Sequence, residues 1–385
     1  MNLSDGRAAL DVTVLKFMNK MIVANLVHRP IRSIISIFAV AVEVTLILMI
    51  VGLALGILDD NKARQVGMGA DLTVRPPGSS NLAAFGGAPV PIRVADILRK
   101  QPHVMAVSPV VLQVTSTTNI EIIYGIDLQS FEALGGPMRY LKGGPFQGPD
   151  DMIVDDLYAA SNKVHVGDPV NVLNHTFRVC GIVPHGRGAR RFIPLTTMQD
   201  LIGAQNKASM FYVKLDDPIN ADAVVEQLKS IPGMESYNIL STSQWLAATS
   251  ADKIPGLNLF IKIVIGIAVI IGFIVIFQSM YTAVMERTRE IGILKSLGAS
   301  KSYVVRVILR ETLLLAVSGI LVGYLISTIG QVGLVHQFPT LRVMPITWKW
   351  AIYAALIAIG GAMLGAIYPA FKAAQKDPID ALAYE

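Results

Sequence analysis

The sequence is poor in the residues that build reactive or metal-binding sites. Cys180 is its only cysteine, so no disulfide forms within the chain, and a single cysteine does not identify the redox compartment. The histidines show no HExxH pattern and no other ligand spacing. Residues 292–302 approach a phosphate-binding loop in composition, but their spacing is wrong and no buried strand precedes them. We therefore expect no catalytic residues, no metal site and no cofactor bound by this chain.

Charged residues are also scarce. Lys, Arg, Asp and Glu make up 16% of the 385 residues, hydrophobic residues make up 52%, and the mean hydropathy of +0.52 is unusually high for a soluble protein. The net charge of +5 and the pI near 9.2 are compatible with nucleic-acid binding. However, the basic residues cluster beside apolar runs, where the positive-inside rule places them. The composition therefore predicts a membrane protein with no nucleic-acid partner.

Four apolar runs are long enough to cross a bilayer of ~30 Å at a rise of 1.5 Å per residue. They are residues 31–58, 257–284, 303–331 and 348–371. Lys and Arg gather before the first run, between the second and third, and after the fourth. We therefore expect a multi-pass protein of the bacterial inner (cytoplasmic) membrane with both termini cytoplasmic. Residues 285–302 and 372–385 are then cytoplasmic, and the short loop 332–347 is periplasmic.

The first apolar run is too long and begins too late for a signal peptide. Before it, apolar residues recur at helical spacing over 12–28. This pattern predicts that residues 1–30 contain an amphipathic helix along the cytoplasmic leaflet. A plain extension of the first span is the alternative.

Residues 59–256 then form one large external domain, in which Pro, Gly, Asp and Asn are enriched. Alternation predicts two strand–helix–strand halves, at about 59–119 and 206–256, and a β-rich insert at about 120–205. Within the insert, 166–173 and 175–183 are expected to pair as strands joined near Asn174. Residues 76–89 are expected to form a loop that contacts a partner or a substrate, or that is a plain flexible connection. The predicted fold class is an α-helical membrane protein with four transmembrane helices and a large α+β domain inserted between the first two.

The charged stretch 286–298, between the second and third spans, carries the strongest signal in the chain. Ile291, Leu294 and Leu297 fall on one helical face, and Gly298 ends the helix. A short amphipathic helix between two spans is expected to lie at the membrane surface and to dock a cytosolic partner. The residues expected at this contact are Glu286, Arg287, Arg289, Glu290, Ile291, Gly292, Leu294, Lys295, Leu297 and Gly298.

Residues 286–300 resemble the cytoplasmic coupling segment of the FtsX/MacB-type permeases, which are membrane subunits of mechanotransmission (type VII) ABC systems. Residues 368–374 and 377–385 resemble the proline-containing end of that family's last span and its closing signature, although Ala383 stands where the family often has Arg. In addition, 167–169 and 181–183 resemble a turn and a strand of the MacB-like periplasmic core domain.

The resemblance implies a homodimer, a separate cytosolic ABC ATPase that holds ATP and Mg, and a periplasmic membrane-fusion (adaptor) protein. In size and layout the chain is most similar to DevC-like permeases. The implied function is export of an amphiphilic substrate such as a lipid, peptide or drug-like molecule. Two alternatives remain: a lipoprotein-releasing permease of the LolC/LolE type, and an FtsX-like regulator of a cell-wall hydrolase that transports nothing. The size of the external domain favours an exporter over the regulator.

Three smaller features remain open. Glu43 lies inside the first span, where a carboxylate costs a few kcal/mol unless it is paired, protonated or hydrated. It is expected to face a cleft between protomers, to pair with a basic residue or to contact a polar group of the substrate. The alternative is a protonated carboxyl that is merely tolerated. Gly52 and Gly56 offer a small-residue surface for dimerisation or face lipid. A glycine-rich loop with three arginines either meets an anionic partner or membrane lipids, or is merely solvated. The three are Arg187, Arg190 and Arg191.

Overall fold

A computed structural model describes residues 30–79, 88–116, 120–250, 252–254 and 256–376. The predicted amphipathic helix at the N-terminus, the closing signature at 377–385 and much of the predicted 76–89 loop lie outside the described residues. The chain divides into two compact units. The helical unit comprises Met1–Leu53, Leu259–Gly333 and Pro345–Glu385, and the α+β unit comprises Ala54–Asn258 and Leu334–Met344.

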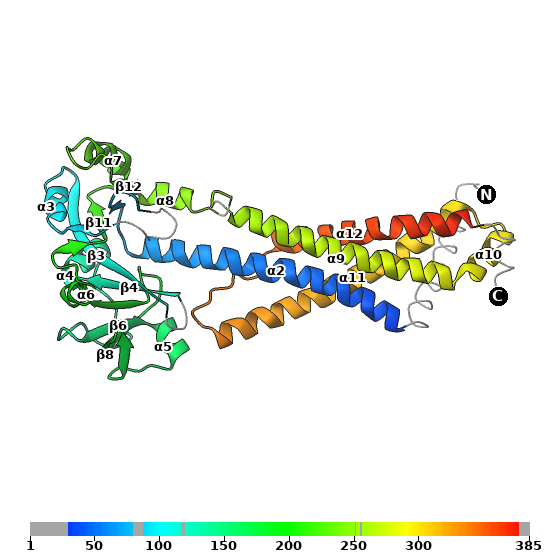
Figure 1. Cartoon of the computed structure of the whole chain (residues 1–385), viewed down its shortest axis with the longest axis horizontal. Helices are drawn as coiled ribbons and strands as arrows, with labels where there is room; N and C mark the ends of the chain where they lie inside the picture. The colour runs from blue at the N-terminus through cyan, green and yellow to red at the C-terminus, as the bar shows by residue number, and fades with distance from the viewer. Residues whose placement is uncertain (1–29, 80–87, 117–119, 251, 255, 377–385) are drawn as a thin grey trace, which may run out of the picture. The chain divides into compact units, whose positions relative to one another are not determined.

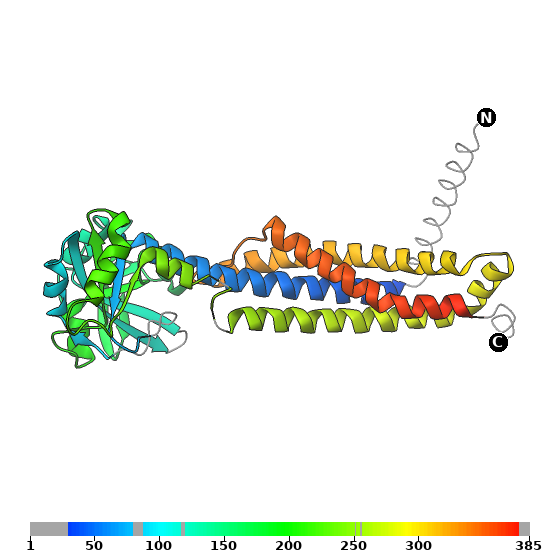
Figure 2. The ribbon, with the colours of Figure 1, turned by 90° about the horizontal axis from the view of Figure 1, so that it is seen from above.

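Four long helices run alongside one another in the helical unit (Figures 1 and 2). They are α2 (Pro30–Gly67), α9 (Leu257–Glu286), α11 (Lys301–Gln337) and α12 (Trp348–Gln375). Each contains one of the four predicted apolar runs and is long and apolar enough to cross a membrane. Exposed Ile270, Leu321 and Leu356 leave apolar side chains outside the bundle, as contact with lipid requires. The short helix α10 (Thr288–Ser296) joins α9 to α11.

Small residues allow these helices to approach closely. A Cβ added at Gly319 or Gly323 of α11 would press on the α2 backbone, and one added at Gly365 of α12 would press on α9. Polar groups join the same contacts: the Ser36 and Ser279 hydroxyls are 2.6 Å apart. Lipid tails give apolar helices no hydrophobic reason to associate, so close backbone packing and interhelical hydrogen bonds hold such a bundle.

One half of the α+β unit contains the two predicted strand–helix–strand segments. The first comprises β1 (Leu72–Arg75), α3 (Val94–Arg99) and β3 (Val104–Ser116), and the second comprises β11 (Met210–Leu215), α7 (Ala221–Lys229) and β12 (Asn238–Ser241). The strands pair antiparallel in the order β12-β1-β11-β3, so the two segments form one sheet. Leu98, Phe211 and Val225 lie in the core between this sheet and the two helices.

The predicted β-rich insert continues the same sheet through β4-β9-β6-β8-β5, with β7 paired to β8. These strands are β4 (Ile120–Ile126), β5 (Lys142–Gly143), β6 (Asp151–Asp155), β7 (Pro169–Val172), β8 (His175–Val183) and β9 (Arg191–Pro194). The β7–β8 hairpin turns through Leu173 and Asn174, both at positive φ, which confirms the predicted join.

The insert is less dominated by strands than the sequence predicts. It also contains α4 (Leu128–Gly135), α5 (Asp156–Asn162) and α6 (Leu195–Leu201). At seven or eight residues these helices complete about two turns, which is too short for a clear helical period. Side-chain caps stabilise two of them: Asp127 accepts from the Ser130 N–H, and Asp155 accepts from the Tyr158 N–H. The remaining elements are β2 (Val90–Pro91), β10 (Lys207–Ala208), a 3-10 helix at Pro218–Asn220 and α8 (Thr242–Ala248).

Gly52 and Gly56 serve neither of the roles left open above. Both glycines are buried within the single chain. A Cβ at Gly56 would overlap the backbone of the 342–344 segment, so its small size makes room for an intrachain contact. The expected dimer surface or lipid-facing surface is therefore absent at Gly56.

Candidate functional site

Helix α10 and the adjoining ends of α9 and α11 surround a cavity of about 110 Å³. Ile291 and Leu294, two of the three residues predicted on one apolar face, line this cavity together with Val304 and Ile308 of α11. Leu297 does not join them. It follows the end of α10 and is 79% exposed. Gly298 has φ +94°, which an L residue rarely adopts, and it ends the helix as predicted.

A buried carboxylate fastens the start of α10 to two other helices. Glu311 of α11 is 4% exposed at its side chain, and its two oxygens lie 3.1 Å from Arg32 Nη2 and 3.1 Å from Arg287 Nη1. Arg32 opens α2, and Arg287 immediately precedes α10. Glu286 contributes less, since it is 41% exposed and 3.7 Å from Arg32. A carboxylate as buried as Glu311 is tolerated because it is paired and hydrogen-bonded.

The end of α10 is fastened to the fourth helix. The Lys295 ammonium donates to the backbone carbonyl of Ala374, at 3.0 Å, and to that of Lys376. These carbonyls belong to the C-terminal end of α12, where the helix dipole favours a cation. Arg289 and Glu290 are exposed, and Gly292 is buried. Through Arg287 and Lys295, α10 is therefore linked to α2, α11 and α12.

Glu43 lies inside the helical bundle. Glu43 is 2% exposed, and its side chain lies against glycines of two neighbouring helices. A Cβ added at Gly272 of α9 would collide with Oε2, and one added at Gly361 of α12 would lie 3.8 Å from Oε1. Oε1 is buried without a hydrogen-bond partner among the described residues. The two glycines thus make room for the carboxyl group, but its role stays a prediction.

The arginines of the predicted basic loop are partly or fully buried, so the solvated-loop alternative is wrong. The Arg187 guanidinium donates to the Gly136 carbonyl at 2.6 Å and lies 5.5 Å from the centre of the Phe131 ring. Burial lowers the pKa of Arg187. Arg191 donates to the Thr115 hydroxyl at 3.0 Å and lies 5.1 Å from the centre of the Tyr158 ring.

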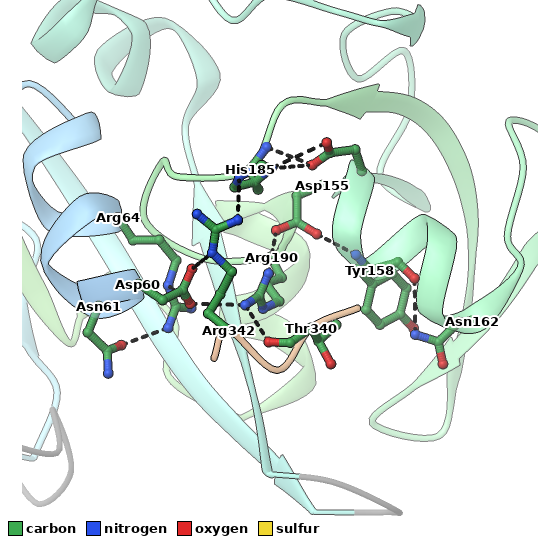
Figure 3. A network of polar contacts seen from close by, with 11 residues as sticks. Asp60, Asn61, Arg64, Asp155, Tyr158, Asn162, His185, Arg190, Thr340 and Arg342 are labelled. Atoms are coloured by element: carbon green, nitrogen blue, oxygen red, sulfur yellow. Dashed lines mark hydrogen bonds and ion pairs between the residues drawn. The ribbon is translucent and has the colours of Figure 1, made fainter. Parts of the chain in front are cut away.

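Arg190 is at the centre of a polar network (Figure 3). It lies 2.9 Å from an oxygen of Asp60 on α2 and 3.1 Å from an oxygen of Asp155 at the end of β6, and it donates to the Thr340 carbonyl at 2.9 Å. Burial raises the pKa of Asp155 to about 6, although Arg190 lowers it. The network joins the far end of α2, the sheet and the segment after α11. Binding of the three loop arginines to an anionic partner stays a prediction.

Sequence reasoning missed Glu311 and its partner Arg32. Glu311 lies inside a predicted span, so the signal that selected Glu43 was also present there. Asp60 and Asp155 gave no comparable signal, because each follows an ordinary element and becomes significant only when folding places it against Arg190.

Residues 33–231 match the family model of the MacB-like periplasmic core domain, and residues 262–378 match that of the FtsX-like permease C-terminal region. A macrolide export ATP-binding/permease protein MacB from Mannheimia succiniciproducens is 25% identical over 95% of this chain and 60% of its own length. The ABC transporter permease YknZ of Bacillus subtilis, described as uncharacterized, is 30% identical over 57% of this chain and 55% of its own length.

The chain spans about half to three fifths of the length of the curated relatives that it matches first, with 60%, 49% and 55% covered. Among solved structures, the periplasmic region of MacB from Actinobacillus actinomycetemcomitans is similar to 47% of this chain, with 92% of that region covered, 21% identity and a TM-score of 0.36.

Proposed function

This chain belongs to the MacB-like permease family, and on that premise we propose that it is the membrane permease subunit of an ABC export system. Two kinds of relative support the proposal. Some are named as combined ATP-binding/permease proteins, and others, such as YknZ and a Methanocaldococcus jannaschii protein, are named as permeases. We propose that this chain resembles the second kind and that a separate cytosolic ABC ATPase holds the ATP and Mg. The permease itself then hydrolyses nothing.

The observation that carries the proposal is the fastening of α10. A partner that pushes on this short helix acts on α9 and α11 through the chain, on α2 through Glu311, and on α12 through Lys295. A displacement is therefore shared by all four long helices instead of being absorbed in a flexible loop. This arrangement suits a subunit that converts closure of two ATPases into movement of an external domain.

The proposed contact is the surface of α10. Arg289 and Glu290 are exposed and supply charges that orient a partner. Ile293 and Leu297 expose 42% and 79% of their surface, and Leu294 lines the neighbouring cavity. An apolar side chain of the ATPase can therefore be buried against α10. Contact with a cytosolic ATPase requires α10 to be cytoplasmic. In the orientation that we propose, both termini are also cytoplasmic and the α+β unit is periplasmic.

We further propose a homodimer in the inner membrane that works with a periplasmic membrane-fusion protein and exports an amphiphilic molecule. Two ATPases acting together require two copies of α10, which a homodimer supplies. The α+β unit is the part that an adaptor would contact. The apolar outer faces of the long helices, with exposed Ile270 and Leu321, leave the bundle surrounded by membrane lipid.

The test is co-purification from solubilised native membranes, with Leu294→Asp as the disruptive variant. The matched control is Leu141→Asp, which makes the same change at a residue that is 48% exposed in the α+β unit. The wild type and the control are expected to retain a cytosolic ABC ATPase, whereas Leu294→Asp inserts normally and loses it. Equal retention by both variants would contradict the role of α10. A lipoprotein carrier or a cell-wall hydrolase in place of the adaptor would replace the exporter by one of the alternative functions.

A further inference from the structure

Five side chains of α9 and α12 form a surface of aromatic rings with a cation at one end. Phe273, Phe277 and Tyr281 recur at every fourth residue of α9, so they share one face of that helix. Their rings stack nearly parallel, with centroids 6.2 Å and 6.1 Å apart. Tyr368 of α12 places its ring 5.9 Å from that of Phe277, and Lys372 follows Tyr368 one turn later. We call these five residues the lysine–aromatic surface.

Two tyrosines hold the Lys372 ammonium in place. Its Nζ lies 5.2 Å from the ring centre of Tyr281 and 5.8 Å from that of Tyr368, and both distances are within the ~6 Å range of cation–π attraction. This attraction orients the ammonium but does not remove its charge. Among the residues that the structure describes, no carboxylate forms an ion pair with Lys372. The described part of the chain therefore leaves a positive charge at this end of the surface.

The lysine–aromatic surface is open on its outer side. Tyr368 is 55% exposed, Phe273 is 37% exposed, and Phe371, which is adjacent to Lys372 in sequence, is 55% exposed. Lys372 and Tyr281 are half-buried. An exposed aromatic surface on two membrane-spanning helices is covered in the membrane either by lipid or by another protein.

The order of the groups along the helices matches that of a phospholipid. The predicted fourth span ends at residue 371, so Lys372 is the first residue beyond it. Tyr281, which contacts Lys372, and Phe273 are eight residues apart, which corresponds to about 12 Å along α9. The rings therefore extend from the level of the lipid head groups into the apolar layer. In the orientation proposed above, this end faces the cytoplasm, and the cytoplasmic leaflet is the one rich in anionic lipids.

We propose that the lysine–aromatic surface binds an anionic phospholipid of the surrounding leaflet, with its phosphate at Lys372 and an acyl chain along Phe277 and Phe273. The tyrosine hydroxyls beside Lys372 supply further hydrogen-bond donors for the head group. A zwitterionic lipid brings a cation of its own toward Lys372, so the anionic head group is preferred. A soluble phosphate would leave the aromatic rings uncovered. Binding requires neither nucleotide nor ATPase, so the inference can fail while the proposed export function stands.

The test is native mass spectrometry of the full chain in detergent micelles, titrated with dioleoylphosphatidylglycerol and, separately, with dioleoylphosphatidylcholine. The wild type is expected to bind phosphatidylglycerol more tightly. Lys372→Gln should weaken phosphatidylglycerol binding by about five- to tenfold and leave phosphatidylcholine binding unchanged, because it removes the charge that meets the phosphate. Lys301→Gln is the matched control. It makes the same change at an exposed lysine that opens α11, outside the lysine–aromatic surface, and should leave both affinities unchanged.

Two further variants separate a specific site from general attraction of anionic lipid to basic residues. Lys372→Arg keeps the charge and should retain more affinity than Lys372→Gln, which also guards against misfolding. Tyr281→Leu keeps the charge but removes a ring that orients it, and should weaken phosphatidylglycerol binding. Equal binding of the two lipids by the wild type would overturn the proposal, as would equal affinities of Lys372→Gln and Lys301→Gln for phosphatidylglycerol.

The same spectra identify the other occupants of this surface. The last nine residues of the chain include Asp377, Asp380 and Glu385. If phosphatidylglycerol binds only after these three are changed to Asn, Asn and Gln, the carboxylates of the chain itself neutralise Lys372. If Lys372→Gln converts a dimer to a monomer without changing lipid binding, a second copy of the chain covers the surface. Either result would overturn the proposal.

Discussion

Removing the charge of Glu311 tests whether α10 is fastened to the bundle as the structure indicates. Glu311→Gln keeps the shape of the side chain but leaves two guanidinium groups, those of Arg32 and Arg287, without the carboxylate that is 3.1 Å from each. The side chains of both arginines are also largely buried, at 13% and 11% exposure. Breaking a buried ion pair by removing one partner costs about 3–5 kcal/mol, because the remaining charge stays desolvated.

Glu286→Gln is the matched control. It makes the same chemical change to the other carboxylate near Arg32, but Glu286 is 41% exposed and its ion pair is long, at 3.7 Å. Exposed pairs of this kind contribute about 0–1 kcal/mol. We therefore expect a large loss of stability for Glu311→Gln and a small one for Glu286→Gln, although both variants replace one glutamate by glutamine.

The assay is thermal unfolding of the full chain in one detergent at neutral pH, followed by co-purification of the ATPase. Glu311→Gln should unfold at a clearly lower temperature and retain less ATPase than Glu286→Gln. Adding Arg287→Gln to Glu311→Gln should recover part of the loss, because it removes one of the uncompensated buried charges. Equal unfolding temperatures for the two Glu→Gln variants, or no recovery in the double variant, would refute the argument from burial and distance.

Two further predictions concern packing and protonation. Gly365→Ala should destabilise the helical bundle by about 1–3 kcal/mol, because the new Cβ would lie 2.8 Å from the backbone oxygen of Phe273, whereas Gly360→Ala on the same helix meets nothing within 4 Å and should be neutral in thermal unfolding. Burial raises the pKa of Asp155 from 3.8 to about 6, so the folded chain holds this proton more tightly and the resulting stability is lost as pH rises from about 4 to about 6. Asp155→Asn should flatten that interval of the pH profile of unfolding, and an unchanged slope would contradict the assignment.

The fold could be predicted to the extent that its signals are local. Apolar runs identify the spans because a bilayer demands about twenty consecutive apolar residues, and alternation identifies the strands of the external domain. The same signals do not locate the end of the helix α2. Hydropathy predicts a span that ends at residue 58, but the helix continues through charged residues to Gly67. Hydropathy marks the thickness of the bilayer, whereas the helix ends only where its backbone hydrogen bonds end.

The candidate site could be predicted only where its signal is local in the sequence. Periodicity places Ile291 and Leu294 on one face, and both line the cavity beside α10. It extends that face to Leu297, which lies beyond the last helical residue. The pairing of Glu311 with Arg32 joins residues that are 279 positions apart, and no local pattern encodes such a contact. Arg190 is a second example. Its glycine-rich loop favours a solvated arginine, but in the folded chain Arg190 pairs with two carboxylates that are distant in sequence, and its side chain is only 14% exposed.

If α10 is displaced by a partner, as the proposed function requires, the polar contacts of the bundle provide the route by which the long helices move with it. Helices in lipid gain little from burying apolar side chains against each other, so apolar packing alone leaves their relative positions poorly fixed. Here the Ser36–Ser279 contact and the hydrogen bond from Thr45 to the Gly323 carbonyl each fix the position of α2 against a neighbour. The Glu311 network does so again at the end nearest α10. Buried polar contacts are best attested as a means of setting register. A bundle with fixed register transmits a displacement of α10 along its helices, whereas a bundle of apolar helices free to slide would dissipate it.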